Sequence, residues 1–251
     1  MLDQIGIDSS DARRFSAAER AGLYRAIFER RDIRSQFLSI PIEDQVLSRV
    51  LRAAHHAGSV GFMQPWNFLL IQSLETRRAV RQLFESANAA AASVYEGETK
   101  ETYRMLKLEG IMEAPLNICV TCDPTRGGPH VLGRHTIRET DVYSTCCAIQ
   151  NLWLAARAEG IGIGWVSILD YAALKRLLGI PEQIVVVAYL CAGYVSEFPD
   201  APELERAGWR QRLPLEEVVW YERWGDRAAS LWKTLHDLII QQDRSRPGYG
   251  G

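Results

Sequence analysis

Hydrophobic residues along the chain fall into short apolar runs separated by stretches with a helical repeat. Three runs read as buried strands, at Phe68–Ile71, Leu116–Cys122 and Ile184–Ala192. A fourth run, IGIGWVSIL from Ile161, predicts a strand that continues into a loop. Between these runs, apolar residues recur every three to four positions, which is typical of amphipathic helices.

The helical stretches carry recognisable boundary signals. Ser16 and Glu19 have the spacing of a capping box, which predicts a helix that runs to about Glu29. The helix expected at 139–159 is apolar over most of its circumference, so it belongs either in the core or at a subunit interface. We expect further helices from Pro41 to just before Gly58, from Ser73, from Tyr171 to Leu178, and around 228–241.

This alternation predicts a three-layer domain of the α/β or α+β class. The chain has no internal repeat and no linker, so we treat residues 1–251 as a single domain. The segment from about 87 to 109 is rich in alanine and charge, which fits either a mobile lid or a solvent-facing helix pair. We expect the polar tail at about 243–251 to be disordered.

Composition argues against several classes of protein. A hydrophobic content of 47% and a net charge of -2 are ordinary for a globular protein and give no reason to expect nucleic-acid or membrane binding. We find no signal peptide, and no window approaches the roughly 18 apolar residues of a membrane span, so we expect a cytoplasmic protein. The five cysteines are odd in number, and four lie in apolar segments, which favours reduced thiols. Cys119 and Cys122 form a C-x-x-C without a second ligand pair, so we expect no metal.

The segment ERRDIRSQF, residues 29–37, sets three arginines around one carboxylate. The forked donors of Arg30, Arg31 and Arg34 suit phosphate oxygens. Asp32 weakens such an anion site, which indicates that this carboxylate has a chemical task. The competing interpretation is an ion pair between Asp32 and Arg34 at a solvated helix end.

Three other polar or glycine-rich segments adjoin core elements, at Gly58–Trp66, Gly164–Asp170 and Arg210–Pro214. The chain has no Walker motif, no G-x-G-x-x-G after a strand, no H-E-x-x-H and no G-x-S-x-G. His55 and His56 lie at a helix end, where the helix dipole favours histidine, so we interpret them as structural.

Together, the four segments resemble the FMN-dependent nitroreductase family from about residue 20 to about residue 220. RRDIR is similar to its phosphate motif, Gly58–Trp66 to its loop ending in Q-P-W, and GIGIGW to the strand end that reaches the flavin. Arg210 and Arg212 match its late basic pair. Asp32 replaces the usual serine and Phe62-Met63 replaces an asparagine-bearing loop, a combination that resembles the 5,6-dimethylbenzimidazole synthase branch.

The resemblance implies that reduced FMN is the substrate and O2 the co-substrate. The products would be 5,6-dimethylbenzimidazole, which is the lower ligand of cobalamin, and erythrose 4-phosphate. It also implies an α+β, three-layer fold in which helices flank a central mixed sheet, and an intertwined homodimer with FMN at the interface. A separate NAD(P)H-dependent flavin reductase would supply the substrate. Two alternatives stay open: an NAD(P)H-dependent FMN nitroreductase or flavin reductase, and a non-catalytic flavin-binding protein.

The same resemblance assigns residues to the site. Asp32 would act as the base for a retro-aldol cleavage of the ribityl chain, which must lose a hydroxyl proton. Ser167 would hydrogen-bond near N5 of the flavin. The candidates for flavin binding are Arg30, Arg31, Asp32, Ile33, Arg34, Gly58, Ser59, Gly61, Met63, Gln64, Ser167, Leu169, Arg210 and Arg212.

Overall fold

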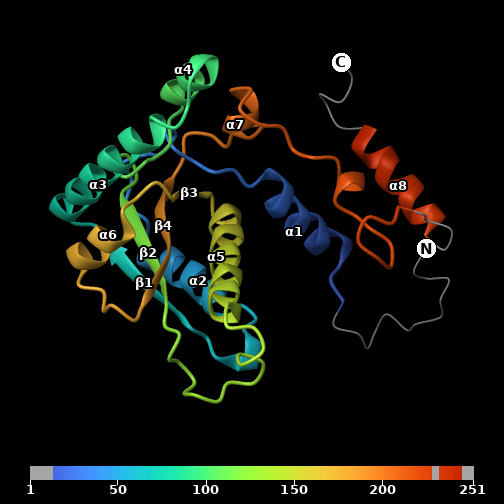
Figure 1. The fold of residues 1–251 in the computed structure, drawn as a ribbon, viewed down its shortest axis with the longest axis horizontal. Coiled ribbons are helices and arrows are strands. Elements are labelled where there is room, and N and C mark those ends of the chain that lie inside the picture. The colour runs from blue at the N-terminus through green and yellow to red at the C-terminus, as the bar shows by residue number, and fades with distance from the viewer. Residues whose placement is uncertain (1–13, 228–231, 245–251) are drawn as a thin grey trace. The chain divides into compact units, whose positions relative to one another are not determined.

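The computed structural model describes residues 14–227 and 232–244. The chain divides into two compact units, Met1–Glu203 and Leu204–Gly251. The first unit contains the sheet and the helices packed on it (Figure 1). That residues 1–251 form a single domain stays a prediction.

The sheet has four strands in the order β1 (Trp66–Ile71), β2 (Leu116–Cys122), β4 (Val185–Tyr194) and β3 (Ile161–Val166). Each neighbouring pair is antiparallel, in place of the mixed sheet that we expected. The parallel element is an isolated bridge between Asp32 and Ile163. Alternation of strands and helices does not determine strand direction. A helical connection can lead into the next strand from either end of the sheet, and that end decides whether the strand is parallel or antiparallel to its neighbour.

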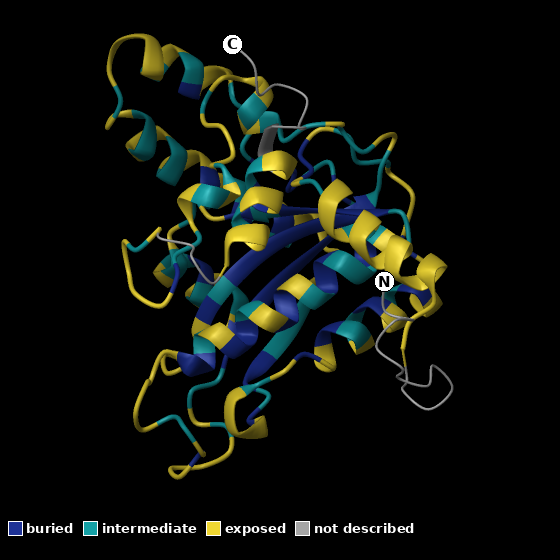
Figure 2. Ribbon diagram, turned by 90° about the vertical axis from the view of Figure 1, so that its right-hand side faces the viewer, coloured by how far each residue is buried: buried dark blue, intermediate teal, exposed yellow. Residues whose placement is uncertain are grey.

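Two pairs of helices cover the two faces of the sheet. Helices α2 (Asp44–His55) and α5 (Thr140–Ala158) cover one face, and α3 (Leu74–Ala92) and α6 (Tyr171–Leu178) cover the other. Side chains alternate along β2, so Ile118 and Val120 pack toward α5 while Cys119 packs toward α3. Figure 2 shows the strands buried between layers whose outer surfaces are exposed. The expected three-layer arrangement is therefore confirmed.

The first helix, α1 (Ala17–Glu29), begins as the sequence predicts. The hydroxyl of Ser16 accepts from the backbone N–H of Glu19 (3.3 Å), and the Glu19 carboxylate accepts from the N–H of Ser16 (2.7 Å). None of the residues of α1 is buried. Helix α2 begins at Asp44, three residues after Pro41, because Glu43 supplies the extended residue before it.

The predicted lid segment forms two helices, the end of α3 and α4 (Gly97–Met105). Tyr103 is only 6% exposed; its ring stacks on Tyr95 with centroids 4.9 Å apart, and its hydroxyl donates to Asn88 (2.6 Å). The segment is therefore a helix pair with a small core of its own. Closure of this pair over a flavin stays a prediction.

The second unit contains η3 (Leu215–Glu217) and α8 (Lys233–Arg244), while α7 (Glu203–Arg206) crosses its first boundary. The helix expected at 228–241 begins at Lys233 among the described residues, and 228–231 lie outside them. Of the tail expected to be disordered, Asp243 and Arg244 end α8, and 245–251 lie outside the described residues. Within 14–227 and 232–244, none of the helices combines the length and hydrophobicity needed to cross a membrane.

The C-x-x-C pair lies on β2, where residues three apart point to opposite faces of the sheet. Both thiols are buried, and burial raises the pKa of Cys119 to about 12. The pKa of Cys122 is also raised by burial. These cysteines are therefore protonated core residues, as the apolar context of their segment predicts.

Candidate active site

The arginine segment lies along the outer edge of β3. Its backbone is extended there, with Ile33 fully buried and its N–H donating to the carbonyl of Ile163 (3.0 Å). A Cβ added at Gly162 would lie 2.8 Å from Cγ1 of Ile33, and one added at Gly164 would lie 2.1 Å from its carbonyl oxygen. Gly162 and Gly164 therefore make room for this segment of the same chain, a reason that the sequence did not reveal.

Asp32 is held at the edge of the sheet with its carboxylate partly open to solvent. Both oxygens accept from the guanidinium of Arg34, one at 2.5 Å, and one oxygen also accepts from the backbone N–H of Trp165 (2.9 Å). The Asp32 side chain is 44% exposed, whereas that of Arg34 is 10% exposed. The ion pair that we considered is thus present, and it fixes the Asp32 carboxylate in place without covering it.

Two arginines of the segment fasten its backbone. Arg34 also donates to the carbonyls of Ile33 (3.1 Å) and Trp165 (3.0 Å). Arg31 donates to the carbonyls of Phe28 (2.8 Å), Arg30 (2.9 Å) and Asp200, and its Nε is buried without a hydrogen-bond partner among the described residues. Contact of these arginines with a phosphate stays a prediction.

Arg30 has a different environment. Its guanidinium carbon lies 4.6 Å from the ring centroid of Trp153 on α5, in a cation–π contact. The indole N–H of Trp153 donates to the carbonyl of Arg31 (3.3 Å). The C-terminal half of α5 therefore contacts the arginine segment at Arg30 and Arg31.

Ser167 and Leu169 follow the end of β3. Ser167 is exposed, and its carbonyl accepts from the N–H of Leu169 (3.1 Å), whose side chain packs into the core beside α6. Because Asp32 bonds the N–H of Trp165, two residues before Ser167, the two catalytic candidates attach to the same strand end. The sequence alone did not predict that Asp32 and Ser167 lie at the same strand end.

The loop Gly58–Trp66 precedes β1 and contains the short 3-10 turn η2 (Val60–Phe62). Its backbone has positive φ at Gly61 (56°), Phe62 (54°) and Gln64 (48°), of which two are unusual for residues with side chains. The hydroxyl of Ser59 accepts from the N–H of Gln64 (3.1 Å) across the loop. Such local strain is concentrated at functional sites.

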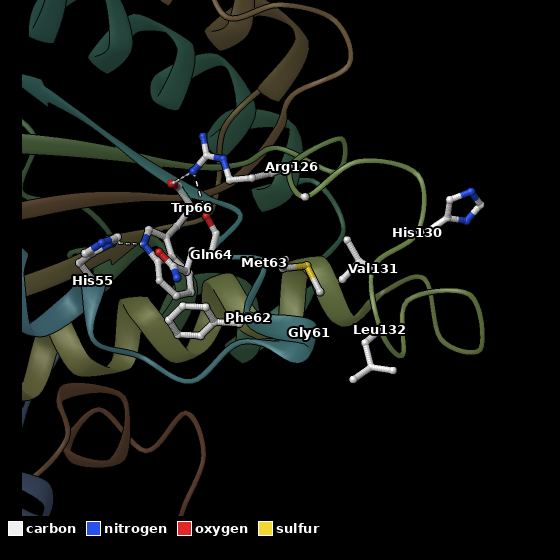
Figure 3. Close-up of a pocket in the computed structure, with 11 residues that line it drawn as sticks. His55, Gly61, Phe62, Met63, Gln64, Trp66, Arg126, His130, Val131 and Leu132 are labelled. Carbon is white, nitrogen blue, oxygen red and sulfur yellow. Dashed lines mark hydrogen bonds between the residues drawn. The ribbon is translucent and has the colours of Figure 1, made fainter.

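This loop forms one wall of a cavity of about 560 Å³ (Figure 3). The opposite wall comes from the connection between β2 and α5, which carries Arg126 and Val131. The indole N–H of Trp66 donates to Nδ1 of His55 (3.1 Å), and the ring of His56 bonds the carbonyl of Arg52, so both histidines have the structural partners that we expected. The lining residues are His55, Gly61, Phe62, Met63, Gln64, Trp66, Arg126, Gly127, His130, Val131 and Leu132.

Arg126 was not among the site residues predicted from the sequence. Its guanidinium donates to the carbonyls of Gln64 (2.9 Å) and Trp66 (2.8 Å) and to the side chain of Asn67. The polar stretch around it, DPTRGGPH, reads as an ordinary loop. The pair Gly127-Gly128 was the sign of a constrained turn available in the sequence, and both residues have positive φ in the structure.

The structure keeps the two predicted parts of the flavin site apart within one chain. The Gly58–Trp66 loop leads into β1, the arginine segment lies outside β3, and β2 and β4 separate these two edges. Three strand spacings alone amount to about 14 Å. Arg210 and Arg212 lie in the second unit and are exposed there.

Comparisons with known proteins place these features in context. Residues 27–194 match the model of the Nitroreductase family. The chain is 42% identical over 200 residues to 5,6-dimethylbenzimidazole synthase of Rhodospirillum rubrum, covering 80% of this chain and 94% of that protein. It is 43% identical over 204 residues to the protein of the same name in Rhodobacter capsulatus, covering 80% and 97%.

Solved structures share the fold at lower identity. Oxidized iodotyrosine deiodinase bound to FMN and 3-iodo-L-tyrosine has a TM-score of 0.64 at 20% identity, covering 80% of this chain and 100% of that one. A BluB-like flavoprotein from Clostridium difficile 630 has a TM-score of 0.60 at 18% identity, covering 80% and 99%. These similarities confirm the fold expected from the four sequence segments.

Proposed function

This chain belongs to the nitroreductase family, and we propose that within it the protein is a 5,6-dimethylbenzimidazole synthase. The reaction is the O2-dependent fragmentation of reduced FMN to 5,6-dimethylbenzimidazole and erythrose 4-phosphate. Relatives of that name, at 42–43% identity, support the proposal, and they match the chain over 80% of its length.

The observation that carries the proposal is the carboxylate of Asp32. A nitroreductase that transfers electrons through bound FMN needs no base beside an arginine cluster, whereas cleavage of a sugar chain needs one. Arg34 and the N–H of Trp165 hold this carboxylate in one orientation while 44% of the side chain stays exposed. A fixed and accessible carboxylate is what a general base requires.

The chain has groups that suit both ends of FMN, the phosphate and the flavin ring. Near the arginine segment, Nε of Arg31 is a buried cationic donor that has no protein partner. Near the loop, the cavity of about 560 Å³ lies within the usual range of ligand pockets, about 300–1,000 Å³. The glycine at position 61 brings backbone close to the cavity, as binding of a flat ring requires.

Each part of the chain then has a task. When bound, reduced FMN supplies the electrons for O2 and the ribityl chain that is cut. Arg30, Arg31 and Arg34, together with Arg210 and Arg212, hold the phosphate. Asp32 accepts the hydroxyl proton of the ribityl chain, and the hydroxyl of Ser167 donates toward N5 of the ring. The remaining contacts come from Ile33, Gly58, Ser59, Gly61, Met63, Gln64 and Leu169.

A homodimer explains how the separated parts of the site can meet. The loop at β1 of one copy and the arginine segment at β3 of the other would face each other across the interface. Helix α5 is suited to this interface because it contacts both parts of the predicted site. Ser144 accepts from the N–H of Val60 in the loop (3.1 Å), and Trp153 contacts Arg30 of the arginine segment. Its open face carries Tyr143, which is 57% exposed, and Cys147.

Cys147→Arg should therefore convert the protein to a monomer and weaken FMN binding by at least about tenfold. A charged residue at the centre of an apolar interface is expensive to desolvate, while the exposed position spares the fold of a single chain. Size-exclusion chromatography with light scattering measures the first effect, and flavin fluorescence titration measures the second.

Arg176→Glu is the matched control, since Arg176 is exposed on α6 at the opposite face of the sheet. It should leave mass and FMN affinity unchanged. A Cys147→Arg protein that remains dimeric, or that becomes monomeric with full FMN affinity, would contradict the shared site.

The reaction itself is tested with chemically reduced FMN and air. Loss of flavin absorbance together with the mass of 5,6-dimethylbenzimidazole is the expected result. Return of unchanged FMN would contradict it. Added NAD(P)H and a nitroarene then separate the two alternatives, because a nitroreductase turns them over and a flavin-binding protein does not.

Two further parts belong to the proposal. A separate NAD(P)H-dependent reductase supplies reduced FMN, because the reaction consumes the flavin and each turnover therefore needs a new molecule of reduced FMN. The location is the cytoplasm, in keeping with five free cysteines, which are typical of a reducing compartment.

A further inference from the structure

The segments 61–64 and 126–134 interlock across the wall of the cavity. A Cβ added at Gly61 would lie 2.6 Å from Cγ1 of Val131 and 2.7 Å from the carbonyl oxygen of Leu132. From the other side, a Cβ at Gly133 would lie 2.9 Å from Cγ1 of Val60. The absence of a side chain at Gly61 and Gly133 therefore allows the two segments to pack closely against each other.

The conformation that is held in this way is an unfavourable one. Phe62 and Gln64 have left-handed backbones, in which Cβ approaches the following carbonyl. Phe62 is 81% exposed, so packing of its own side chain does not compensate. Contacts made to the loop backbone from other segments therefore add to the internal bond between Ser59 and Gln64.

Arg126 makes those contacts. One terminal nitrogen bonds the carbonyls of Gln64 and Trp66 together, on both sides of Pro65 (Figure 3). The other terminal nitrogen bonds the side chain of Asn67. The three acceptors lie at the end of the strained turn and the start of β1. The planar guanidinium reaches these acceptors from two separate nitrogens in a fixed geometry, whereas an ammonium group has its donors on a single nitrogen.

Arg126 is itself held from behind. Arg134 donates to the carbonyls of Arg126 (2.7 Å) and Gly128 (2.8 Å) and to the Asp141 carboxylate (2.9 Å) at the start of α5. The Arg134 and Asp141 side chains are only 13% and 8% exposed. A continuous set of charge-assisted hydrogen bonds thus runs from α5 to the loop.

We propose that Arg126 is a positioning residue for the reaction, because its guanidinium holds the 61–64 loop, in which Gly61, Phe62 and Gln64 are left-handed, and thereby sets how reduced flavin is divided between fragmentation and simple reoxidation. The inference rests on the proposed function. In the unproductive branch, two electrons and two protons pass from reduced FMN to O2, which gives FMN and H2O2. A loop that is displaced leaves this branch open while it slows the one that requires exact placement of the ring.

Arg126→Lys and Arg126→Ala test the inference in single turnovers. Enzyme is kept in excess of reduced FMN and well above the dissociation constant that each variant shows for FMN, so that free flavin does not contribute. The yield of 5,6-dimethylbenzimidazole should fall at least about tenfold, and H2O2 should rise to account for the flavin lost from that branch. The lysine variant should fail nearly as completely as the alanine variant, because it keeps the charge and loses the fork.

Arg138→Ala is the control, since Arg138 lies in the same connection and is exposed. It should divide the flavin as the unaltered enzyme does. A simple loss of stability lowers the amount of active enzyme and does not change the product ratio of the flavin that is bound, and a melting curve for each variant records it separately.

Wild-type product ratios in both Arg126 variants would overturn the inference. So would a raised dissociation constant with an unchanged ratio at saturation, because Arg126 would then be a binding contact. If the unaltered enzyme gives no 5,6-dimethylbenzimidazole, the proposed function has failed as well, and that result is recognised without any variant.

Discussion

Asp32→Asn should reduce fragmentation of FMN by about 10³-fold and leave FMN affinity unchanged or higher. The amide can still accept from the N–H of Trp165, so the local backbone keeps one of its bonds. It cannot accept a proton, which removes the base. Removal of a negative charge beside the phosphate site also favours binding of the dianion.

The opposite direction of the two effects distinguishes a base from a structural ion pair. If Asp32 served only to hold Arg34, its loss would loosen the segment and weaken FMN binding together with activity. The assay combines product mass at saturating reduced FMN with a separate titration by oxidised FMN. A variant that forms product at a normal rate would eliminate the assignment.

Two further variants complete the experiment. Glu29→Gln removes an exposed carboxylate from the same stretch, one that pairs with Arg25 and Arg157, and it should have little effect on either quantity. Ser167→Gly should permit flavin oxidation and lose fragmentation, if the hydroxyl acts at the ring as proposed.

Gly164→Ala should lower the free energy of unfolding by about 3 kcal/mol and weaken FMN binding at least about tenfold. The added Cβ would lie 2.1 Å from the carbonyl oxygen of Ile33 and 2.7 Å from Nη1 of Arg34. Backbone of a buried residue has to move, and the bond from the N–H of Ile33 to Ile163 opposes that movement. The arginine segment is therefore displaced from the strand that positions Asp32.

Gly22→Ala is the matched control in α1, where an added Cβ meets nothing within 4 Å. This substitution should stabilise the helix by about 0.5–1 kcal/mol. Thermal unfolding and FMN titration of both variants give the comparison. A Gly164→Ala protein with the unfolding temperature and FMN affinity of the unaltered protein would show that the segment is not fixed by β3.

The candidate site was only partly accessible from the sequence. The spacing of RRDIR placed Asp32 and Arg34 correctly as neighbours, because residues two apart in an extended segment share a side. The role of Gly162 and Gly164 was not accessible in this way, since the group that requires their small size comes from residue 33, more than a hundred positions earlier. Arg126 was missed for the same reason: its acceptors lie about sixty residues away.

The sequence by itself determined the elements of this protein. The capping box at Ser16, the apolar run of β2 and the glycine that closes α6 are local signals, and local hydrogen bonding and burial are enough to specify them. Only the tertiary structure decided the strand directions, the attachment of Asp32 to β3 and the placement of the two predicted parts of the flavin site on opposite edges of the sheet. Those features depend on contacts between residues distant in the chain, whose partners no local pattern identifies.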